Sequence, residues 1–278
     1  MTQGATVART TGKTLIMGVL NAAPDSFYSP SRVSSPDEVR TLGHAMAEDG
    51  ADILDIGGES TRPGAEPIDA AEEQARVLPL LETLSDAGIT LSVDTYRSTT
   101  AYEATKLGAT MINDITALRG DPEMAGVVAQ SGAECVLMHM QGAPNTMQDA
   151  PEYEDVVDDI AAFFEERIAY ATRSGIAEDK LWLDPGFGFG KTVGHNLTIL
   201  RRLGELRRFG LPVVIGTSNK STIGTVLDVP VDERLEGTAA TVALAIHNGA
   251  DCVRVHDVKS MARVARMTDA VLGGGDFD

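Results

Sequence analysis

Eight short apolar runs recur along the chain, and each ends in polar or charged residues before a helix-length interval leads to the next run. A strand buried in a parallel sheet is expected to be apolar throughout, so polar residues at the same end of every run need a cause. A closed parallel barrel supplies one, because the carboxyl ends of all its strands meet at one mouth. The runs are Leu15–Leu20, Ile53–Ile56, Ile89–Val93, Thr110–Ile112, Cys135–Met138, Leu181–Leu183, Val213–Ile215 and Cys252–Val255.

The intervals between the runs have the period and the end signals of helices. Ser35 precedes Pro36 as an N-cap, and Gly108 and Gly210 follow predicted helices directly before the next run. This alternation predicts the α/β class and a single (β/α)8 TIM barrel over residues 14–272, behind an N-terminal extension of residues 1–13. Besides the helix at Pro36, the predicted helices are Asp69–Leu84, Ser98–Leu107, Tyr153–Ser174, Asn196–Phe209 and Arg234–Asn248.

Composition agrees with a barrel and restricts its partners. The chain has 278 residues, of which 43% are hydrophobic, enough to fill such a core. A net charge of −18 argues against nucleic acid or an anionic membrane as the partner. No run approaches the roughly 18 apolar residues of a membrane span, and the N-terminus lacks the apolar core of a secretory signal. We therefore expect a cytoplasmic protein that acts on small molecules.

Cys135 and Cys252 lie far apart, each inside a predicted strand, and no Cys/His cluster accompanies them. They are expected to be small buried hydrophobes. Two strand-to-helix connections are unusually long, Asn21–Ser35 and Gly57–Asp69. Loops of that length are typically lids over a site or disordered segments, and here both lie at the predicted mouth.

Three polar residues close three different runs and indicate what the mouth binds. They are Asp94, Asn113 and Asp184. A carboxylate only accepts hydrogen bonds, whereas an amide both donates and accepts, so this set suits a flat ligand with several N–H donors, such as a 2-amino-4-oxo pyrimidine edge. The alternative is that each residue bonds a neighbouring loop or caps a helix.

Cations follow the last two runs, where this fold commonly binds phosphate. Lys220, Arg254 and His256 lie there, and Arg62 lies in the second long loop. Arginine offers a planar fork to phosphate oxygens and lysine a mobile charge. The alternatives are surface cations that raise solubility and, for Arg254, a buried pair with a structural carboxylate.

Other residues give weaker indications. Glycines between Asp184 and Lys191 allow close approach to a ligand, and Phe189 among them either stacks on a ring or anchors packing. Met138 and the following His139 either line the ring pocket or belong to the core. Asn21 either starts a turn or offers one oxygen to Mg²⁺, which then depends on the ligand's phosphates for the rest.

Taken together, these motifs resemble dihydropteroate synthase, a pterin-binding transferase family of folate biosynthesis. The matching segments run in order along nearly the whole chain: Met17–Phe27, Asp55–Gly64, Asp94–Tyr96, Ile112–Asp114, Leu137–Met140, Leu183–Lys191, Gly216–Ser221 and Arg254–Asp257.

The resemblance implies a reaction, in which 6-hydroxymethyl-7,8-dihydropterin diphosphate joins p-aminobenzoate, giving 7,8-dihydropteroate and diphosphate. It implies Mg²⁺ held in part by Asn21, a homodimer, and catalysis through Asp94, Asp184, Lys220 and Arg254. Asn113 completes the pterin-reading set. The other implied substrate-binding residues are Phe27, Thr61, Arg62, Pro63, Met138, Phe189, Gly216, Ser221 and His256, with Phe27 and Pro63 closing over the aminobenzoate.

Three positions depart from the family's usual pattern. Ala23 replaces a threonine, Asn219 an arginine and Thr222 an aromatic residue. We hypothesise that these changes alter discrimination between p-aminobenzoate and sulfonamides, to be tested by comparing the KM of the first with the Ki of the second before and after Thr222→Phe.

Two other functions stay open. One is a methyltetrahydrofolate–corrinoid methyltransferase, against which the phosphate-binding residues argue. The other is a non-catalytic pterin-binding homologue.

Overall fold

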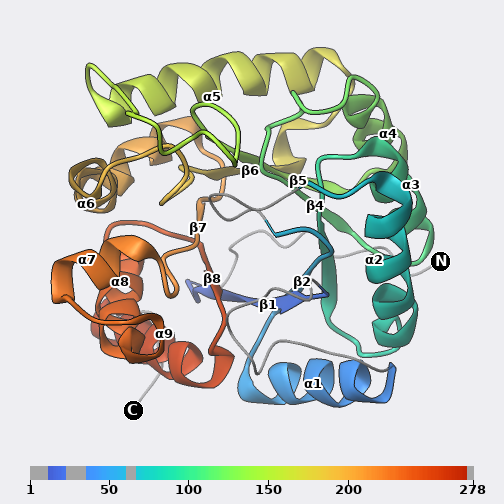
Figure 1. Ribbon diagram of the computed structural model, residues 1–278, viewed down its shortest axis with the longest axis horizontal. Helices are drawn as coiled ribbons and strands as arrows, with labels where there is room; N and C mark the ends of the chain where they lie inside the picture. Colours follow the sequence, from blue (N-terminus) through green and yellow to red (C-terminus); the bar gives the residue numbers. More distant parts are fainter. Residues whose placement is uncertain (1–11, 23–35, 61–66, 274–278) are drawn as a thin grey trace.

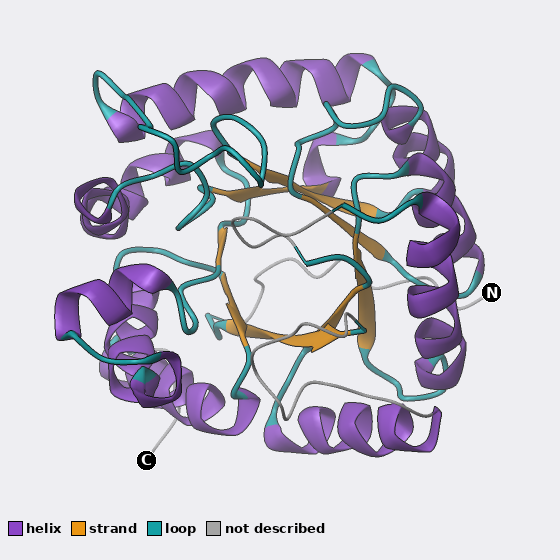
Figure 2. Ribbon diagram, viewed as in Figure 1, coloured by secondary structure: helices purple, strands orange, loops and turns teal. Residues whose placement is uncertain are grey.

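A computed structural model describes residues 12–22, 36–60 and 67–273. Eight parallel strands form one sheet in the order β6-β5-β4-β3-β2-β1-β8-β7, and the helices surround it (Figures 1 and 2). A bridge between Leu183 and Val213 joins β6 to β7 and closes the predicted (β/α)8 barrel. The strands are β1 Leu15–Asn21, β2 Ile53–Gly57, β3 Thr90–Asp94, β4 Met111–Asp114, β5 Glu134–Met138, β6 Leu181–Asp184, β7 Val214–Ile215 and β8 Cys252–Val255.

All six helices predicted from the sequence are present, and two of them begin three residues away from their predicted start. In the described part of the chain, three further α-helices, for which no bounds were predicted, also follow strands. The helix predicted from Tyr153 begins at Val156, because the Asp155 carboxylate caps it by accepting from the N–H groups of Val157 and Asp158. The helix predicted as Asn196–Phe209 begins at Val193 and changes to a 3-10 helix at Leu203. The helices are α1 Pro36–Asp49, α2 Ala70–Leu84, α3 Ser98–Lys106, α4 Met124–Ser131, α5 Val156–Arg173, α6 Val193–Arg202, α7 Ser221–Leu227, α8 Leu235–His247 and α9 Val258–Val271.

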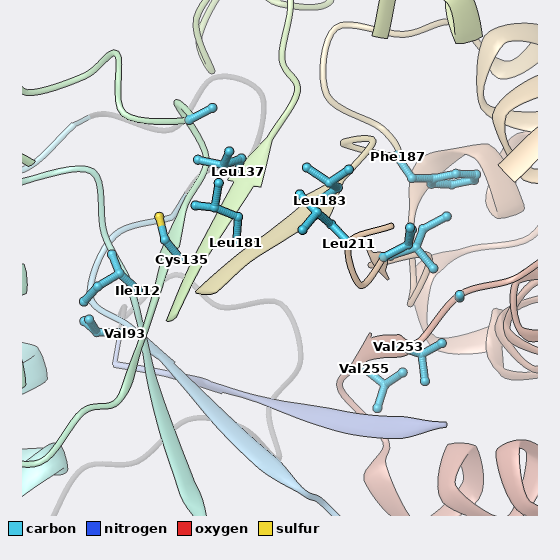
Figure 3. Close-up of a cluster of buried hydrophobic side chains, with 14 of the residues drawn as sticks. Val93, Ile112, Cys135, Leu137, Leu181, Leu183, Phe187, Leu211, Val253 and Val255 are labelled. Atoms are coloured by element: carbon cyan, nitrogen blue, oxygen red, sulfur yellow. The ribbon is translucent and has the colours of Figure 1, made fainter. Parts of the chain in front are cut away.

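Two apolar cores hold the barrel together. Alternate strand residues pack outward against the helices, among them Val93, Ile112, Leu137 and Leu183 (Figure 3). A second cluster contains Met17, Ile53, Met111, Val136, Trp182, Val214 and Cys252, which come from seven strands. This second cluster fills the barrel interior below the strand ends, so a ligand can enter only from the mouth.

Both cysteines are buried and free, as predicted. Among the residues that the structure describes, no helix combines the length and apolar character needed to cross a membrane. The predicted extension, residues 1–13, lies almost wholly outside the described residues, so the boundary at residue 14 stays a prediction.

Candidate active site

The polar strand ends converge at one mouth, as the sequence predicts. Strand register pairs Asn21 with Gly57, Gly57 with Asp94, and Asp94 with Asn113, so these four residues lie at one level of neighbouring strands. Each of the predicted polar endings in β1, β3, β4 and β6 belongs to its strand rather than to the loop after it. Their positions are therefore fixed by the sheet's own hydrogen bonds.

Asp55 is the centre of the polar network below this level. Its side chain is fully buried and accepts from Ser92 Oγ at 2.6 Å, Asn113 Nδ2 at 3.0 Å and Arg254 Nε at 2.6 Å. Asp55 was not predicted as a site residue from the sequence. Its position inside the apolar run Ile53–Ile56 could have indicated it, because a charged side chain is stable in a core only when it has partners.

Arg254 has the buried carboxylate partners that were one of its alternatives. Besides Asp55, its Nη2 donates to Asp94 Oδ2 at 2.8 Å. Burial lowers the pKa of Arg254, but the two carboxylates outweigh burial and raise it above its ordinary value. Contact with phosphate stays a prediction for this residue. Asn113, whose Nδ2 is used by Asp55, keeps its Oδ1 as an acceptor for a ligand.

The two carboxylates of the mouth hold protons unusually well. Burial raises the pKa of Asp94 to about 7, although Arg254 opposes the shift. Burial also raises the pKa of Asp184, against the effect of the Gly186 N–H, which donates to Asp184 Oδ1 at 2.7 Å. A ligand that brings N–H donors and positive charge stabilises the ionised form of both groups.

Lys220 and Phe189 form one wall of the mouth. The Lys220 ammonium lies 4.1 Å from the centroid of the Phe189 ring, and Phe189 also packs on a buried cluster that includes Met138 and Ile115. Strand register pairs Met138 with Asp184, so the apolar cluster lies next to one of the three residues predicted to bind the pterin. Phe189 is thus a packing anchor that also faces a cation.

The loop after β7, residues 216–220, lies beside the two basic side chains at the end of β8, Arg254 and His256. The His256 backbone N–H donates to Ser218 Oγ at 3.3 Å, and His256 Nδ1 lies 3.0 Å from the same oxygen. A side chain on Gly216 would contact Arg254, since an added Cβ would lie 3.7 Å from Arg254 Cβ. Ser221 is the first residue of α7. The structure thus brings this loop beside Arg254.

Thr222, one of the three positions that depart from the family pattern, is buried. It is 3% exposed, and its Oγ1 accepts from Asn196 Nδ2 at 2.9 Å. Asn196 Oδ1 in turn accepts from the Gly188 N–H at 2.8 Å, which links the glycine-rich loop to α7. A phenylalanine at position 222 would break this buried link, so Thr222→Phe does not isolate an effect on drug binding.

His139 belongs to the core rather than to the pocket. Its ring meets Phe163 edge-on, and Lys191 Nζ lies 3.0 Å from its Nδ1. Burial and the neighbouring Lys191 lower the pKa of His139 to about 2, so the ring is neutral. The core alternative is correct for this residue. Strand alternation could have indicated it, because Met138 and His139 are consecutive and face opposite ways.

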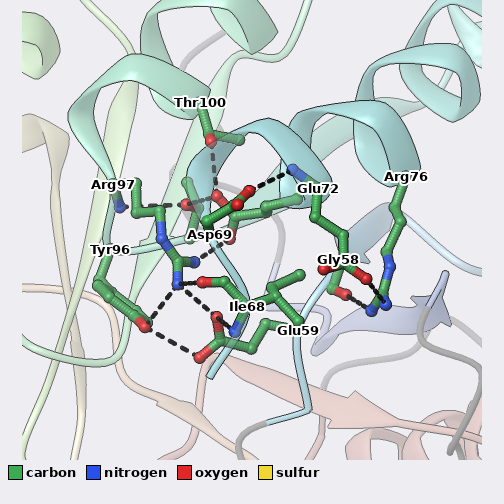
Figure 4. Close-up of polar contacts among 11 residues, drawn as sticks. Gly58, Glu59, Ile68, Asp69, Glu72, Arg76, Tyr96, Arg97 and Thr100 are labelled. Carbon is green, nitrogen blue, oxygen red and sulfur yellow. Dashed lines mark hydrogen bonds and ion pairs between the residues drawn. The ribbon is translucent and has the colours of Figure 1, made fainter. Parts of the chain in front are cut away.

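A half-buried arginine, Arg97, joins the two described ends of the β2–α2 loop (Figure 4). Arg97 Nη2 donates to Glu59 Oε2 at 2.6 Å and to the Ile68 carbonyl, and its Nη1 donates to Glu73 Oε1 at 3.0 Å. Tyr96 OH donates to Glu59 Oε1 at 2.9 Å, and burial raises the pKa of Tyr96 to about 12. These contacts fix the base of the loop to the strand end at Asp94.

The predicted residues Phe27, Thr61, Arg62 and Pro63, and the departure at Ala23, lie outside the described residues. The role of Asn21 as a ligand of Mg²⁺ stays a prediction. An added Cβ on Gly57 would lie 3.5 Å from Asn21 Oδ1 and 3.7 Å from Asp94 Oδ2, so the glycine leaves room beside both oxygens. Among the described residues, no group of three or more His, Cys, Asp and Glu could hold a metal.

Comparison with known proteins agrees with this geometry. A family profile described as pterin binding enzyme matches residues 17–256. Dihydropteroate synthase of Bacillus subtilis is 46% identical over 264 residues, covering 95% of this chain and 90% of the relative. The barrel and its mouth therefore define a pterin-binding enzyme.

Solved structures narrow the class. The Yersinia pestis dihydropteroate synthase, solved with a sulfonamide drug complex, superposes with a TM-score of 0.90 at 41% identity, covering 95% of this chain and 96% of that one. The Clostridium difficile enzyme, crystallised in the presence of pteroic acid, gives a TM-score of 0.85 at 45% identity, covering 94% and 97%. The chain belongs to the dihydropteroate synthase family and is a transferase of folate biosynthesis.

Proposed function

We propose that Asp94, Asn113 and Asp184 hold the pterin edge of 6-hydroxymethyl-7,8-dihydropterin diphosphate while p-aminobenzoate displaces the diphosphate. The observation that carries this proposal is the convergence of three acceptors at one mouth, of which Asn113 and Asp184 are buried and Asp94 is paired with Arg254. The pterin ring offers N–H donors to the two carboxylates, and the Asn113 Oδ1 accepts a further N–H. Met138 and Phe189 supply apolar surface for its faces.

Catalysis in this proposal is electrostatic. Breaking the C–O bond to diphosphate leaves positive charge on the pterin methylene, and the Asp94 and Asp184 carboxylates stabilise that charge. The neutral aniline nitrogen forms the new C–N bond, and its proton leaves to solvent as the diphosphate departs. No strong general base is required, because an aniline nitrogen already carries a free electron pair at neutral pH.

In this proposal Arg254 and His256 bind the diphosphate, together with Thr61 and Arg62 from the β2–α2 loop, and Lys220 lies near the pterin ring. Arg254 has five N–H donors, of which two contact Asp55 and Asp94, so others are available. Gly216 and Ser221 border the aminobenzoate, over which Phe27 and Pro63 close. Asn21 would hold Mg²⁺ through its side-chain oxygen, and the bound ion would neutralise charge on the leaving diphosphate.

A turnover assay with the purified protein tests this function. We expect diphosphate release only when the pterin diphosphate, p-aminobenzoate and Mg²⁺ are all present, with dihydropteroate formed in equal amount. A non-catalytic homologue would bind the pterin without releasing diphosphate. A corrinoid-dependent methyltransferase would instead demethylate methyltetrahydrofolate in the presence of the corrinoid partner.

The ionisation of Asp94 predicts a pH dependence. Because its pKa in the ligand-free protein is raised to about 7, the carboxylate that accepts pterin N–H groups forms only as pH rises through that value. We expect kcat/KM for the pterin diphosphate to rise with pH through about 7, and the profile of Asp94→Asn to lack this step. Identical profiles for the two proteins would contradict the assignment.

The free energy of unfolding should fall with rising pH, whereas kcat/KM should rise. The folded protein binds the Asp94 proton more tightly than the unfolded chain, whose ordinary pKa is 3.8. This group therefore makes the free energy of unfolding decrease as pH rises from about 4 to about 7.

Asn21→Ala is expected to weaken the dependence on magnesium. Loss of the single protein oxygen should raise the Mg²⁺ concentration for half-maximal rate by about tenfold, while the Kd of a pterin lacking phosphates stays unchanged. Titrating Mg²⁺ in the turnover assay measures the first quantity and calorimetry the second. An unchanged magnesium requirement would remove Asn21 from the metal site.

We further propose a homodimer built on α7 and α8. Five large apolar side chains are exposed on or between these helices: Val226, Leu227, Val231, Leu235 and Leu244. Several exposed large apolar side chains on neighbouring elements of a globular enzyme are typical of a protein interface. Sedimentation equilibrium should give twice the chain mass, and Leu227→Glu with Leu235→Glu should halve it. A monomeric wild-type protein would contradict the proposal.

We also propose a cytoplasmic location, which is expected from the sequence.

A further inference from the structure

The loop that carries Lys220 and Ser221 is held by a residue from the other side of α7. Arg234 precedes α8, and its Nη1 donates to the Asn219 carbonyl at 2.9 Å. Asn219 has a φ of 58°, in the left-handed region that asparagine tolerates better than most residues. Its backbone N–H donates to Thr238 Oγ1 at 3.2 Å, so both polar backbone groups of Asn219 are bound to α8 or its N-cap.

The guanidinium of Arg234 lies directly on the backbone of α7 at Gly224. An added Cβ on Gly224 would lie 2.4 Å from Arg234 Nη2 and 2.6 Å from its Cζ, so any other residue would displace the guanidinium. Arg234 Nε is buried there and, among the described residues, has no hydrogen-bond partner. A buried N–H group without a partner is unfavourable, so the Nε group does not explain the position of the Arg234 side chain.

The contact at Asn219 is directly coupled to the site. Lys220 is the N-cap of α7, and its carbonyl accepts from the Ile223 N–H at 3.0 Å, so the orientation of Asn219 sets where α7 begins. The Lys220 side chain extends from this point to the Phe189 ring. A rotation of the Asn219 peptide would therefore move the ammonium and Ser221 together.

We propose that Arg234 is a positioning residue for the transfer reaction, which holds Asn219 so that Lys220 and Ser221 face the substrates. This inference rests on the proposed roles of Lys220 and Ser221. Arg234 touches neither substrate. It acts by fixing one peptide unit at the start of α7, and Gly224 is the matching position because only glycine leaves space for the guanidinium.

Three variants test the proposal against the wild type. Arg234→Ala removes the contact, Gly224→Ala displaces the guanidinium, and Asn219→Gly keeps both the carbonyl and the left-handed φ. Arg263→Ala, which removes an exposed arginine on α9, is the control for charge. For each protein, kcat, both KM values and the Kd of a pterin without phosphates are measured, along with hydrogen exchange of peptides spanning residues 216–222.

Arg234→Ala is expected to lower kcat/KM for p-aminobenzoate by about 10- to 100-fold, the usual effect of misplacing a catalytic group by about 1 Å. Pterin Kd should stay within about twofold, because the readers on β3, β4 and β6 are independent of α7. Gly224→Ala should reproduce the loss, and the double variant should be no worse than either single one. Asn219→Gly and Arg263→Ala should resemble the wild type.

Hydrogen exchange gives a result that does not depend on turnover. Faster exchange over residues 216–222 in Arg234→Ala, with unchanged exchange in β3, supports the inference that Arg234 holds Asn219 in place. That support stands even if the wild type proves inactive, a result that would overturn the proposed function alone. Unchanged exchange in this segment overturns the inference that Arg234 holds Asn219. A loss of kcat/KM of less than about threefold, or an equal loss in Arg263→Ala, overturns the positioning role.

Discussion

Asp184→Asn is expected to lower kcat/KM for the pterin diphosphate by about 10⁴-fold, because the variant offers an N–H₂ group where the ligand also donates. Asp184 is 7% exposed, so water cannot replace the lost hydrogen bonds. The negative charge that favours the cationic pterin methylene also disappears. Steady-state rates with the pterin substrate varied at saturating p-aminobenzoate measure the effect.

The fold of this variant should survive. Asparagine has nearly the size of aspartate, and its Oδ1 can still accept from the Gly186 N–H that Asp184 binds. Asp179→Asn is the matched control, since Asp179 is exposed and lies in the short 3-10 helix that precedes β6, away from the mouth. A loss of less than about tenfold in Asp184→Asn would remove this carboxylate from pterin recognition.

Arg254→Ala is expected to lower the free energy of unfolding by about 3–5 kcal/mol, the effect of leaving buried charges without their partner. Arg254 Nε and Nη2 contact Asp55 and Asp94, and Asp55 is fully buried. Urea unfolding at pH 8 measures the loss. At pH 5 the loss should be smaller, because Asp94 then carries a proton and less negative charge remains unpaired.

A double variant separates the loss of the ion pair from the loss of side-chain packing at Arg254. Arg254→Met with Asp55→Asn removes one charge of each sign and should recover part of the stability lost in Arg254→Met alone. Neither variant is expected to turn over at a normal rate, since Asp94 loses its partner in both. A stability loss below about 1 kcal/mol in Arg254→Ala would mean that the network is hydrated and contributes little.

The sequence predicted the barrel and the row Asp94, Asn113 and Asp184 for the same reason. Strand periodicity and turn residues determine where each strand ends, and in a parallel barrel all those ends meet. The sheet then confirmed that the polar endings are themselves strand residues, with Asn21, Gly57, Asp94 and Asn113 in one register and Asp184 paired with Met138. Local patterns carry this information because each strand contributes it separately.

The partners of the site could not be predicted in this way. Asp55 and Arg254 are 199 residues apart, and only the closed barrel places one against the other. The Arg97 network and the Arg234 contact likewise join separate loops, and no local pattern encodes them. The break between α6 and the following 3-10 helix was also missed, because both parts share one apolar period.

The central claim is that Asp94, Asn113 and Asp184 bind the pterin edge at the barrel mouth. A crystal structure of the protein with the pterin diphosphate tests it most directly. The account predicts the 2-amino-4-oxo edge within hydrogen-bond distance of all three side chains, and the diphosphate beside Arg254 and His256. A pterin ring bound elsewhere, or turned so that its diphosphate meets Asp184, would contradict it.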